Sequence, residues 1–275
     1  MPSAEAQAAQ AAPATERWDV LALRYATLRS TKRELYHRYE AYGEPDAEIE
    51  MAYYFWVLRS ATQTVLFDTG FDPAAGIRRG RSMHIAPVEA LRRAGVEPES
   101  VSTIVVSHMH YDHIGNIAAF PQARLVVPRR ELEFWSGPMA ARAQFAGHVE
   151  QAEVAALVRA RDDGRVTLTD GVEEILEGVT AHCVGGHSPG QLVIAVSAAG
   201  GATVVLASDA VHFYEEYELD RPFGVIVDLP GMYAAYDLLR TLVAPPGALL
   251  VPGHDPGVLT RFPVAVEDGS AVRLA

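Results

Sequence analysis

Cysteine is nearly absent from the sequence, since Cys183 is the only one in 275 residues. A lone cysteine excludes an internal disulfide framework and is compatible with a reducing compartment. Basic residues are also scarce, because 23 lysines and arginines stand against 35 acidic residues and give a formal net charge of −12. Binding to nucleic acid depends on clusters of lysine and arginine that neutralise phosphates, so this balance argues against a nucleic-acid partner.

Long apolar segments and a leader-like start are missing as well. No uninterrupted apolar run approaches the roughly 20 residues that a membrane-spanning helix needs. Residues 1–17 are rich in alanine and glutamine and lack the basic start and apolar centre of a signal peptide. We therefore expect a disordered tail over 1–17, a cytoplasmic protein and no contact with a membrane.

The rest of the chain alternates strand-like and helix-like segments, at an ordinary globular composition of 49% hydrophobic and 21% charged residues. The pattern predicts strands at 18–26, 48–59, 62–67, 103–106, 124–127, 166–169, 179–184, 191–196, 203–207 and 249–251. It predicts helices near 85–91, within 129–161 with breaks at Gly137 and Gly147, and at 232–243. Without a repeat or a linker, we expect one α/β domain over 18–275 whose sheets are covered by helices.

Three histidines and an aspartate stand within six residues, directly after the predicted strand 103–106. The segment contains His108, His110, Asp112 and His113. In a loop that leaves a strand, alternate residues share a face while the last two wrap around, so all four side chains can point at a cation. The alternative is a chance group of histidines, but burying so many titratable groups without an ion would be costly. The pattern therefore predicts a metal site.

Three further candidate ligands also follow predicted strands. His187 lies in the turn GGHSPG, Asp209 follows the strand 203–207, and His254 follows the strand 249–251. Taken singly, each has an ordinary alternative, either a hydrogen-bonded loop histidine or a helix-capping aspartate. Their shared placement at the carboxyl ends of strands favours one common centre. Seven ligands are too many for one tetrahedral ion, so we expect two metals.

The order of these motifs resembles the metallo-β-lactamase superfamily of binuclear metallohydrolases. The motifs are HMHYDH, GGHSPG, SDA and PGHD, and the earlier LFDTG, which contains Asp68, resembles that family's first motif. The resemblance implies a four-layered αβ/βα sandwich, in which helices flank two mixed β-sheets and the metals lie at one edge. It implies one metal held by His108, His110 and His187, and another held by Asp112, His113 and His254. It also implies that Asp209 bridges the metals and that Asp68 supports a ligand from behind.

Within that superfamily, the segment SDAVHFYEE and the chain length resemble the N-acyl-homoserine lactone hydrolases and related lactonases. Those enzymes commonly carry a tyrosine three residues after the bridging aspartate, where it contacts the substrate carbonyl. Here that position is His212, and Tyr214 two residues on would point elsewhere. The resemblance implies an enzyme with two Zn²⁺ per chain, or Mn²⁺ or Fe²⁺, that opens a lactone by attack of a metal-bridging hydroxide.

We assign roles on this basis. Asp112 would shuttle a proton, His212 would donate to the carbonyl oxygen, and Tyr111 would contact the substrate. The partner would be a small molecule with a lactone or ester carbonyl, and a monomer or a homodimer fits equally well. A hydrolase of the same fold acting on another ester, a thioester or an amide is the alternative. A non-enzymatic metal-binding or regulatory protein is a third interpretation.

The remaining candidates receive structural interpretations. Cys183 stands four residues before His187, but a lone cysteine is usually a small buried hydrophobe. One aromatic and methionine group lines an apolar acyl pocket or belongs to a helix core: Phe134, Trp135, Met139 and Phe145. The other histidines have no motif around them and are expected to be structural or exposed: His37, His84, His148 and His182.

Overall fold

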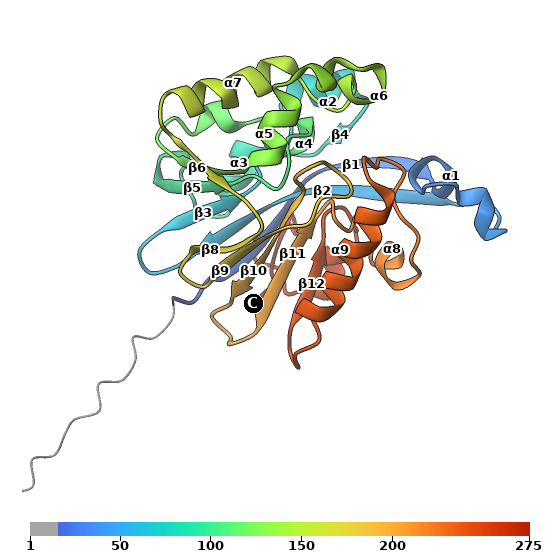
Figure 1. Cartoon of the computed structure of the whole chain (residues 1–275). Coiled ribbons are helices and arrows are strands. Elements are labelled where there is room, and N and C mark those ends of the chain that lie inside the picture. The colour runs from blue at the N-terminus through green and yellow to red at the C-terminus, as the bar shows by residue number, and fades with distance from the viewer. Residues whose placement is uncertain (1–15) are drawn as a thin grey trace, which may run out of the picture.

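The computed structural model describes residues 16–275, so residues 1–15 of the predicted tail lie outside the described residues. Two β-sheets lie face to face, and helices cover the outer face of each (Figure 1). Glu16 accepts hydrogen bonds from Thr62 Oγ1 at 2.8 Å and Gln63 Nε2 at 3.2 Å, which ties the start of the described chain to the first sheet.

The first sheet has eight strands and the second has five. The first contains β1 (Asp19–Thr31), β2 (Glu48–Arg59), β3 (Thr64–Phe67), β4 (Ser82–Met83), β5 (Val101–Val105), β6 (Arg124–Pro128), β7 (Val166–Thr169) and β13 (Ala271–Arg273). Its order is β13-β1-β2-β3-β5-β6-β7, with β4 paired to β1. The second contains β8 (Val172–Leu176), β9 (Val179–Cys183), β10 (Leu192–Ser197), β11 (Thr203–Ser208) and β12 (Leu249–Pro252). Its order is β12-β11-β10-β9-β8, and both sheets mix parallel and antiparallel pairs.

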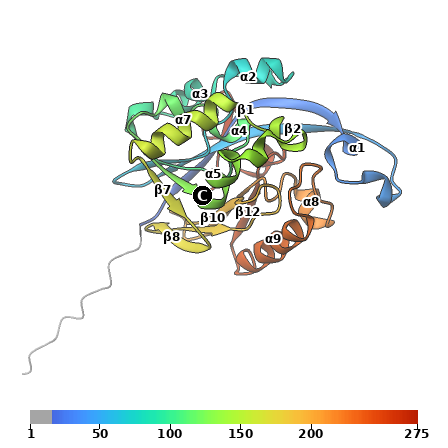
Figure 2. The same cartoon turned by 45° about the horizontal axis from the view of Figure 1, so that its top comes forward.

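The described residues form ten α-helices, and the longer ones lie on the two outer faces (Figure 1). The ten helices are α1 (Lys32–Leu35), α2 (Pro73–Arg78), α3 (Pro87–Arg93), α4 (Tyr111–Ile114), α5 (Arg129–Trp135), α6 (Ala143–Ala146), α7 (Gln151–Asp162), α8 (Tyr214–Glu218), α9 (Leu229–Leu242) and α10 (Val258–Arg261). The turned view shows α2, α3, α5 and α7 over the first sheet and α8 and α9 beyond the second (Figure 2). Among the described residues, no helix combines the length and the apolar character needed to cross a bilayer.

Three hydrophobic clusters join the four layers. Successive residues of β2 point to opposite faces of the pleated strand, so Phe55 packs under the helices while Trp56 packs against the other sheet. The third cluster lies between the second sheet and α9, where Val205 meets Tyr236 and Leu239. The predicted αβ/βα sandwich with two mixed sheets is therefore confirmed.

Most predicted strands are present with small changes of bounds, and the predictions for β2 and β7 match the observed bounds. Strand β1 continues to Thr31, beyond the predicted end at residue 26. The prediction missed β8, an edge strand whose adjacent Glu173 and Glu174 are exposed and break the apolar alternation. It also missed β13, which has only three residues. Both strands gain their stability from a neighbour in the sheet, and local sequence does not reveal that neighbour.

Strand ends bring distant segments together at one edge of the sandwich. Strands β11 and β12 are parallel, so the loops that leave their carboxyl ends lie side by side. Leu192 N donates to Ser107 O at 2.8 Å, which joins β10 of the second sheet to the loop after β5 of the first. Ala52 N donates to His254 O at 2.8 Å, which joins β2 to the loop after β12. All the predicted ligand segments therefore meet at this edge.

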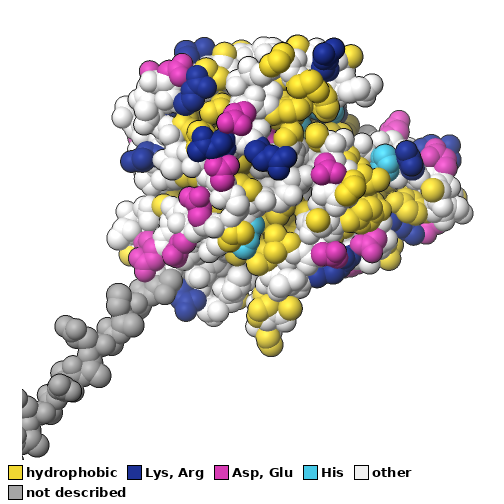
Figure 3. All heavy atoms as spheres, in the orientation of Figure 1, with side chains coloured by type: hydrophobic (Ala, Val, Ile, Leu, Met, Phe, Trp, Pro, Cys, Tyr) yellow, Lys and Arg dark blue, Asp and Glu magenta, His cyan; other side chains and the backbone are white. Residues whose placement is uncertain are grey.

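The face presented in Figure 1 carries a mixed surface. Acidic and basic side chains lie interspersed there among hydrophobic ones, over the helices that cover the first sheet (Figure 3). This face therefore presents no field of a single charge sign.

Candidate metal centre

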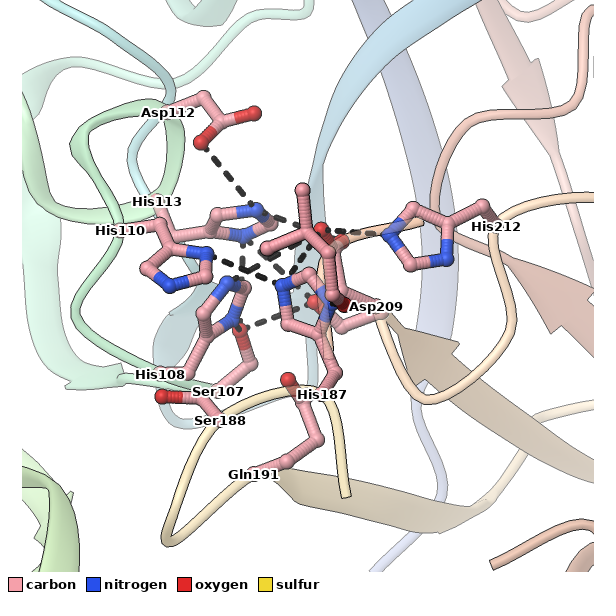
Figure 4. Close-up of polar contacts among 12 residues, drawn as sticks. Ser107, His108, His110, Asp112, His113, His187, Ser188, Gln191, Asp209 and His212 are labelled. Carbon is pink, nitrogen blue, oxygen red and sulfur yellow. Dashed lines mark hydrogen bonds and ion pairs between the residues drawn. The ribbon is translucent and has the colours of Figure 1, made fainter. Parts of the chain in front are cut away.

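The seven predicted ligands converge on one buried site (Figure 4). One group of ligand atoms, all within 4.8 Å of one another, comes from His108, His110 and His187. A second group with the same spacing comes from Asp112, His113 and His254. We call these the first set and the second set. They are the two ligand sets that the resemblance implied.

Asp209 lies between the two sets and presents one carboxylate oxygen to each. Its Oδ2 lies 3.4 Å from His187 Nε2 and 3.9 Å from His108 Nε2. Its Oδ1 lies 3.0 Å from His254 Nε2 and 3.3 Å from His113 Nε2. This arrangement allows one carboxylate to bind two cations at once.

The ring nitrogens show whether the site fits a metal pair. The Nε2 atoms of His108 and His113 are buried without a hydrogen-bond partner among the described residues. His187 Nδ1 donates to Val225 O at 2.9 Å, so its Nε2 carries a lone pair, and that atom lies 3.0 Å from His110 Nδ1. Buried nitrogens with converging lone pairs are stabilised by a shared cation. The nitrogen and carboxylate donors therefore fit zinc, manganese or iron.

The protonation states of the first set and of Asp209 agree with cation binding. Burial, together with the neighbouring imidazoles, lowers the pKa of His108, His110 and His187 well below the usual value. Burial opposes the ionisation of Asp209, but the charges of His254 and then His113 hold its pKa well below the usual range. Neutral histidines and an ionised aspartate are the forms that bind metals. Burial lowers the pKa of His113, but Asp209 and then Asp68 and Asp112 outweigh it and raise the value well above the usual one, so a metal would displace a proton from this ring.

Asp68 stands behind the second set, where the motif LFDTG leaves β3. Its Oδ2 accepts a hydrogen bond from His113 Nδ1 at 2.8 Å, and its Oδ1 accepts one from Ser107 N at 2.8 Å. Its backbone φ of +64° lies in the left-handed region, which non-glycine residues occupy at a cost. The carboxylate fixes the tautomer of His113 and directs Nε2 of that ring at the centre.

A second buried carboxylate, Glu131 of α5, was not predicted from the sequence. It accepts hydrogen bonds from Met109 N at 3.0 Å and from Ser188 Oγ at 2.8 Å. It therefore joins the loop that carries His108 and His110 to the loop that carries His187. Nothing in the local sequence distinguishes this glutamate from other charged residues of a helical segment.

Gly190 permits that junction. Its N–H donates to Glu131 Oε1, and a Cβ built on it would lie 2.9 Å from Glu131 N. A larger residue would push the His187 loop away from the start of α5, so glycine is required here by a close approach of two backbones.

His212 lies behind Asp209 and does not line the cavity next to the site. Its Nε2 lies 3.2 Å from Asp209 Oδ2 without the geometry of a hydrogen bond, and its Nδ1 lies 3.2 Å from Glu216 Oε2. With His187 and Asp209, His212 forms a further group whose spacing could hold a metal. Its ring stacks on Phe223 with the centroids 3.7 Å apart, and Phe223 is the residue of this pair that lines the cavity. Burial lowers the pKa of His212, but Asp209 and Glu216 outweigh it and raise the value to about 9. The side chain of Tyr214 points elsewhere, because its hydroxyl donates to Leu250 O at 3.3 Å.

A cavity of about 450 Å³ opens onto the site. Its wall includes Asp209 together with Tyr111 and Asp112, the residues predicted to meet the substrate. His148, for which no motif predicted a role, also lines this cavity, and its ring lies 5.1 Å from that of His110. A reacting molecule in this cavity would meet the ligand sets directly.

A neighbouring cavity, also of about 450 Å³, lies beyond His148. Trp135 and Phe145, two members of the predicted acyl-pocket group, line it. Phe134 instead packs against Trp135 with the ring centroids 5.0 Å apart, and Met139 is 47% exposed. Only part of the predicted group therefore borders a space that an acyl chain could occupy.

Cys183 stands outside every ligand group that the described residues form. Its side chain is partly buried and packs against the cluster between the two sheets. Burial raises the pKa of its thiol to about 11, which keeps it protonated.

Known lactonases share both sequence and fold with this chain. The N-acyl homoserine lactonase AiiA of Bacillus thuringiensis subsp. kurstaki is 25% identical over 225 residues, which cover 77% of this chain and 84% of that protein. The N-acyl homoserine lactonase AttM of Azorhizobium caulinodans is 30% identical over 188 residues, which cover 65% and 66%.

Solved structures agree in fold. An N-acyl homoserine lactone hydrolase with N-hexanoyl-L-homoserine at its catalytic metal centre has a TM-score of 0.74 at 19% identity, and the match covers 90% of this chain and 97% of that one. AidC, a dizinc quorum-quenching lactonase, has a TM-score of 0.66 at 19% identity, with 88% and 92% covered. The family model described as the metallo-beta-lactamase superfamily matches residues 50–254. The resemblance of the motifs is therefore confirmed, and the chain belongs to the metallo-beta-lactamase superfamily.

Proposed function

We propose that the protein is a metal-dependent hydrolase that opens the ring of an N-acyl-homoserine lactone or a related lactone. The observation that carries this proposal is the position of Asp209, which presents one oxygen to each ligand set at the wall of a cavity. The relatives named as lactonases support the choice of a lactone over another ester. Action in the cytoplasm and the oligomeric state stay predictions.

Two zinc ions would be held by the two sets, with Asp209 between them, and manganese or iron would suit the same donors. When bound, such a pair polarises the scissile carbonyl and lowers the pKa of water towards neutrality, so that hydroxide becomes available as the nucleophile. Asp68 would keep His113 in the orientation that this pair requires.

Asp112 is placed to move the proton during ring opening. Its Oδ1 lies 3.7 Å from His113 Nε2 and its Oδ2 lies 4.0 Å from His254 Nε2, and the side chain borders the cavity. As oxygen from water bonds to the carbonyl carbon and the ring C–O bond breaks, Asp112 would accept the proton of the attacking water. It would then deliver that proton to the ring oxygen that leaves.

His212 would hold Asp209 rather than the substrate. The sequence led us to expect a hydrogen bond from His212 to the carbonyl oxygen, but the ring is fully buried beneath Phe223. Its contact with Asp209 Oδ2 and the support from Glu216 on its other nitrogen favour a positioning role. Among the proposed groups, Tyr111 would contact the substrate directly, because its side chain borders the cavity.

The test is turnover of a substrate panel by protein purified without chelator and analysed for its metal content. The panel contains acyl-homoserine lactones of several chain lengths, a simple γ-lactone, a thioester, an aryl ester and a chromogenic β-lactam. We expect the lactones to be opened fastest, with the hydroxy acid product identified by mass spectrometry. Faster turnover of the thioester or the aryl ester would replace the lactonase proposal with the alternative hydrolase.

A further inference from the structure

One arginine on the wall of the main cavity has no acidic partner. Arg81 follows α2 and lines the cavity together with Tyr111 and Asp112. Its Nε donates to Tyr111 Oη at 2.9 Å and its Nη1 donates to Arg79 O at 3.1 Å. Within residues 16–275, no carboxylate oxygen lies within 4.0 Å of its guanidinium, and its Nη2 has no acceptor at hydrogen-bond distance.

The neighbouring Arg79 shows the opposite arrangement on the same wall. Its Nη2 lies 2.9 Å from Glu150 Oε1, and its Nη1 donates to Gly147 O at 2.7 Å. Its guanidinium lies 4.0 Å from the centre of the Tyr111 ring. Arg79 therefore forms an ion pair with a carboxylate of the protein, whereas Arg81 forms none and is influenced by the charge of Asp112 only from a longer distance. A guanidinium partly withdrawn from water is stabilised when an anion completes its contacts.

The polar groups around Arg81 offer donors. The Tyr111 oxygen accepts the Nε–H of Arg81 and also pairs with the hydroxyl of Tyr53. With Tyr53 as the donor of that pair, the phenolic proton of Tyr111 can be donated to another molecule. The Nη2 group of Arg81 adds further N–H donors on the same side. Such a wall suits a ligand group that only accepts hydrogen bonds, and a carboxylate meets a guanidinium through short, charge-assisted bonds.

We propose that Arg81, assisted by Tyr111, binds a carboxylate on the acyl chain of the substrate, away from the ring carbonyl that is hydrolysed. This inference rests on the proposed lactonase function and names the substrate class as a lactone whose acyl chain carries a negative charge. Leu28, Leu35 and Met51 line the same cavity and would contact the methylene groups between ring and carboxylate. A monoanion fits better than a dianion, because only the Nη2 group of Arg81 makes no hydrogen bond within the described residues and the chain carries a net charge of −12.

The test compares two substrates that differ only in charge. N-adipoyl-homoserine lactone ends in a carboxylate, and its methyl ester has the same chain with a neutral end. With the metal-loaded wild-type protein, we expect the carboxylate form to have a KM about 10- to 100-fold lower, the range for a hydrogen bond to a charged group, and a similar kcat. The ring-opened carboxylate product should likewise inhibit more strongly than its methyl ester.

Variants then assign the preference to Arg81. Arg81→Met should remove the preference by raising the KM of the carboxylate form far more than that of the methyl ester, so that the two KM values converge. Arg81→Lys keeps the charge without the planar fork and should retain part of the preference. Arg78→Met is the matched control, because Arg78 is exposed and pairs with Glu150 outside the cavity. It should keep the full preference.

The outcomes separate this inference from the function on which it rests. If the wild-type protein opens the methyl ester at least as well as the carboxylate form, the inference is overturned and the lactonase proposal stands. The same conclusion follows if Arg81→Met keeps the preference. If neither lactone is opened by metal-loaded protein, both proposals fail. The wild-type comparison needs no variant, so it decides the question even if Arg81→Met does not fold.

Discussion

The two ligand sets are held from behind in different ways. In the second set a carboxylate touches a ligand directly, because Asp68 Oδ2 lies 2.8 Å from His113 Nδ1. Behind the first set, Glu131 instead accepts hydrogen bonds from Met109 N and Ser188 Oγ, which belong to the loops that carry the ligands. Asp68 therefore acts on an imidazole, whereas Glu131 acts on the course of two loops.

The difference matters because the two carboxylates are equally buried. Asp68 and Glu131 are both 0% exposed, and a carboxylate in such a place is stable only when donors surround it. Ser107 N, Ser107 Oγ and Ser208 Oγ also donate to Asp68, while Trp135 Nε1 contributes to the contacts of Glu131 at 2.8 Å. The two equally buried carboxylates therefore have different effects. Asp68 orients one ligand of the second set, and Glu131 fixes the backbone of the loops that carry the first set.

The largest effect is expected where the two sets meet. Asp209→Asn replaces one of the two oxygens that face the sets with an amide nitrogen, which is a poor metal ligand. We expect turnover to fall by more than about 100-fold, beyond the range typical of residues that only support ligands. Elemental analysis of the same sample should show well below two metals per chain. Full metal content together with near wild-type turnover would remove Asp209 from the centre.

A matched pair of variants tests the comparison itself. Asp68→Asn should weaken binding of the second metal by about 10- to 100-fold. Its amide oxygen can keep the hydrogen bond from Ser107 N while its NH₂ faces hydroxyls that can rotate, so the Tm of the metal-free protein should fall less than in Glu131→Gln. Glu131→Gln places an amide NH₂ among donors such as Met109 N, so buried groups lose their acceptor at about 1–3 kcal/mol each. The Tm of the metal-free Glu131→Gln protein should therefore fall, and both metals should bind more weakly together.

Metal titrations and thermal unfolding of the metal-free proteins measure these two effects. The proposed difference, that Asp68 supports a ligand and Glu131 supports the loops, would be lost if Asp68→Asn lowered the Tm as much as Glu131→Gln does. It would also be lost if Glu131→Gln released only one of the two metals.

A smaller loss is expected at His212. If this ring holds Asp209, His212→Gln keeps an N–H donor and should lower metal affinity by about 10-fold, the lower end of the range for supporting residues. His212→Ala should lower it further. The informative measurement is turnover at saturating metal, where a positioning role predicts recovery of most of the rate. A large loss of kcat with both metals bound would instead favour the carbonyl contact expected from the sequence.

Local sequence predicts the parts of the site that depend on one segment at a time. The ligands of the segment 108–113 follow a buried strand, and Asp209 and His254 follow two others. The apolar pattern of each strand and the position of its end were therefore enough to predict that these residues lie at one edge. Glu131, Glu216 and Arg81 were missed because their significance depends on partners far along the chain. The direction of the His212 ring was likewise unpredictable, since Phe223 fixes it from another loop.

The smallest effect is expected at Cys183, which lies at the end of β9 only four residues before His187. Its backbone N–H donates to Gly171 O at 2.7 Å, a bond that alanine keeps, so Cys183→Ala removes only a partly buried sulfur. Turnover should therefore stay within about threefold of the wild type. A threefold change corresponds to about 0.7 kcal/mol of transition-state stabilisation.

The thiol itself should also react slowly. With a pKa of about 11, only about one thiol in a thousand is ionised at pH 8, and the thiolate is the reactive form. Alkylation by iodoacetamide should therefore be far slower than that of a free cysteine, and should leave the metal content unchanged. A loss of turnover in Cys183→Ala comparable with that of Asp209→Asn, in a folded protein, would mean that the sulfur belongs to the centre. Asp209 would then not be the only residue that joins the two sets.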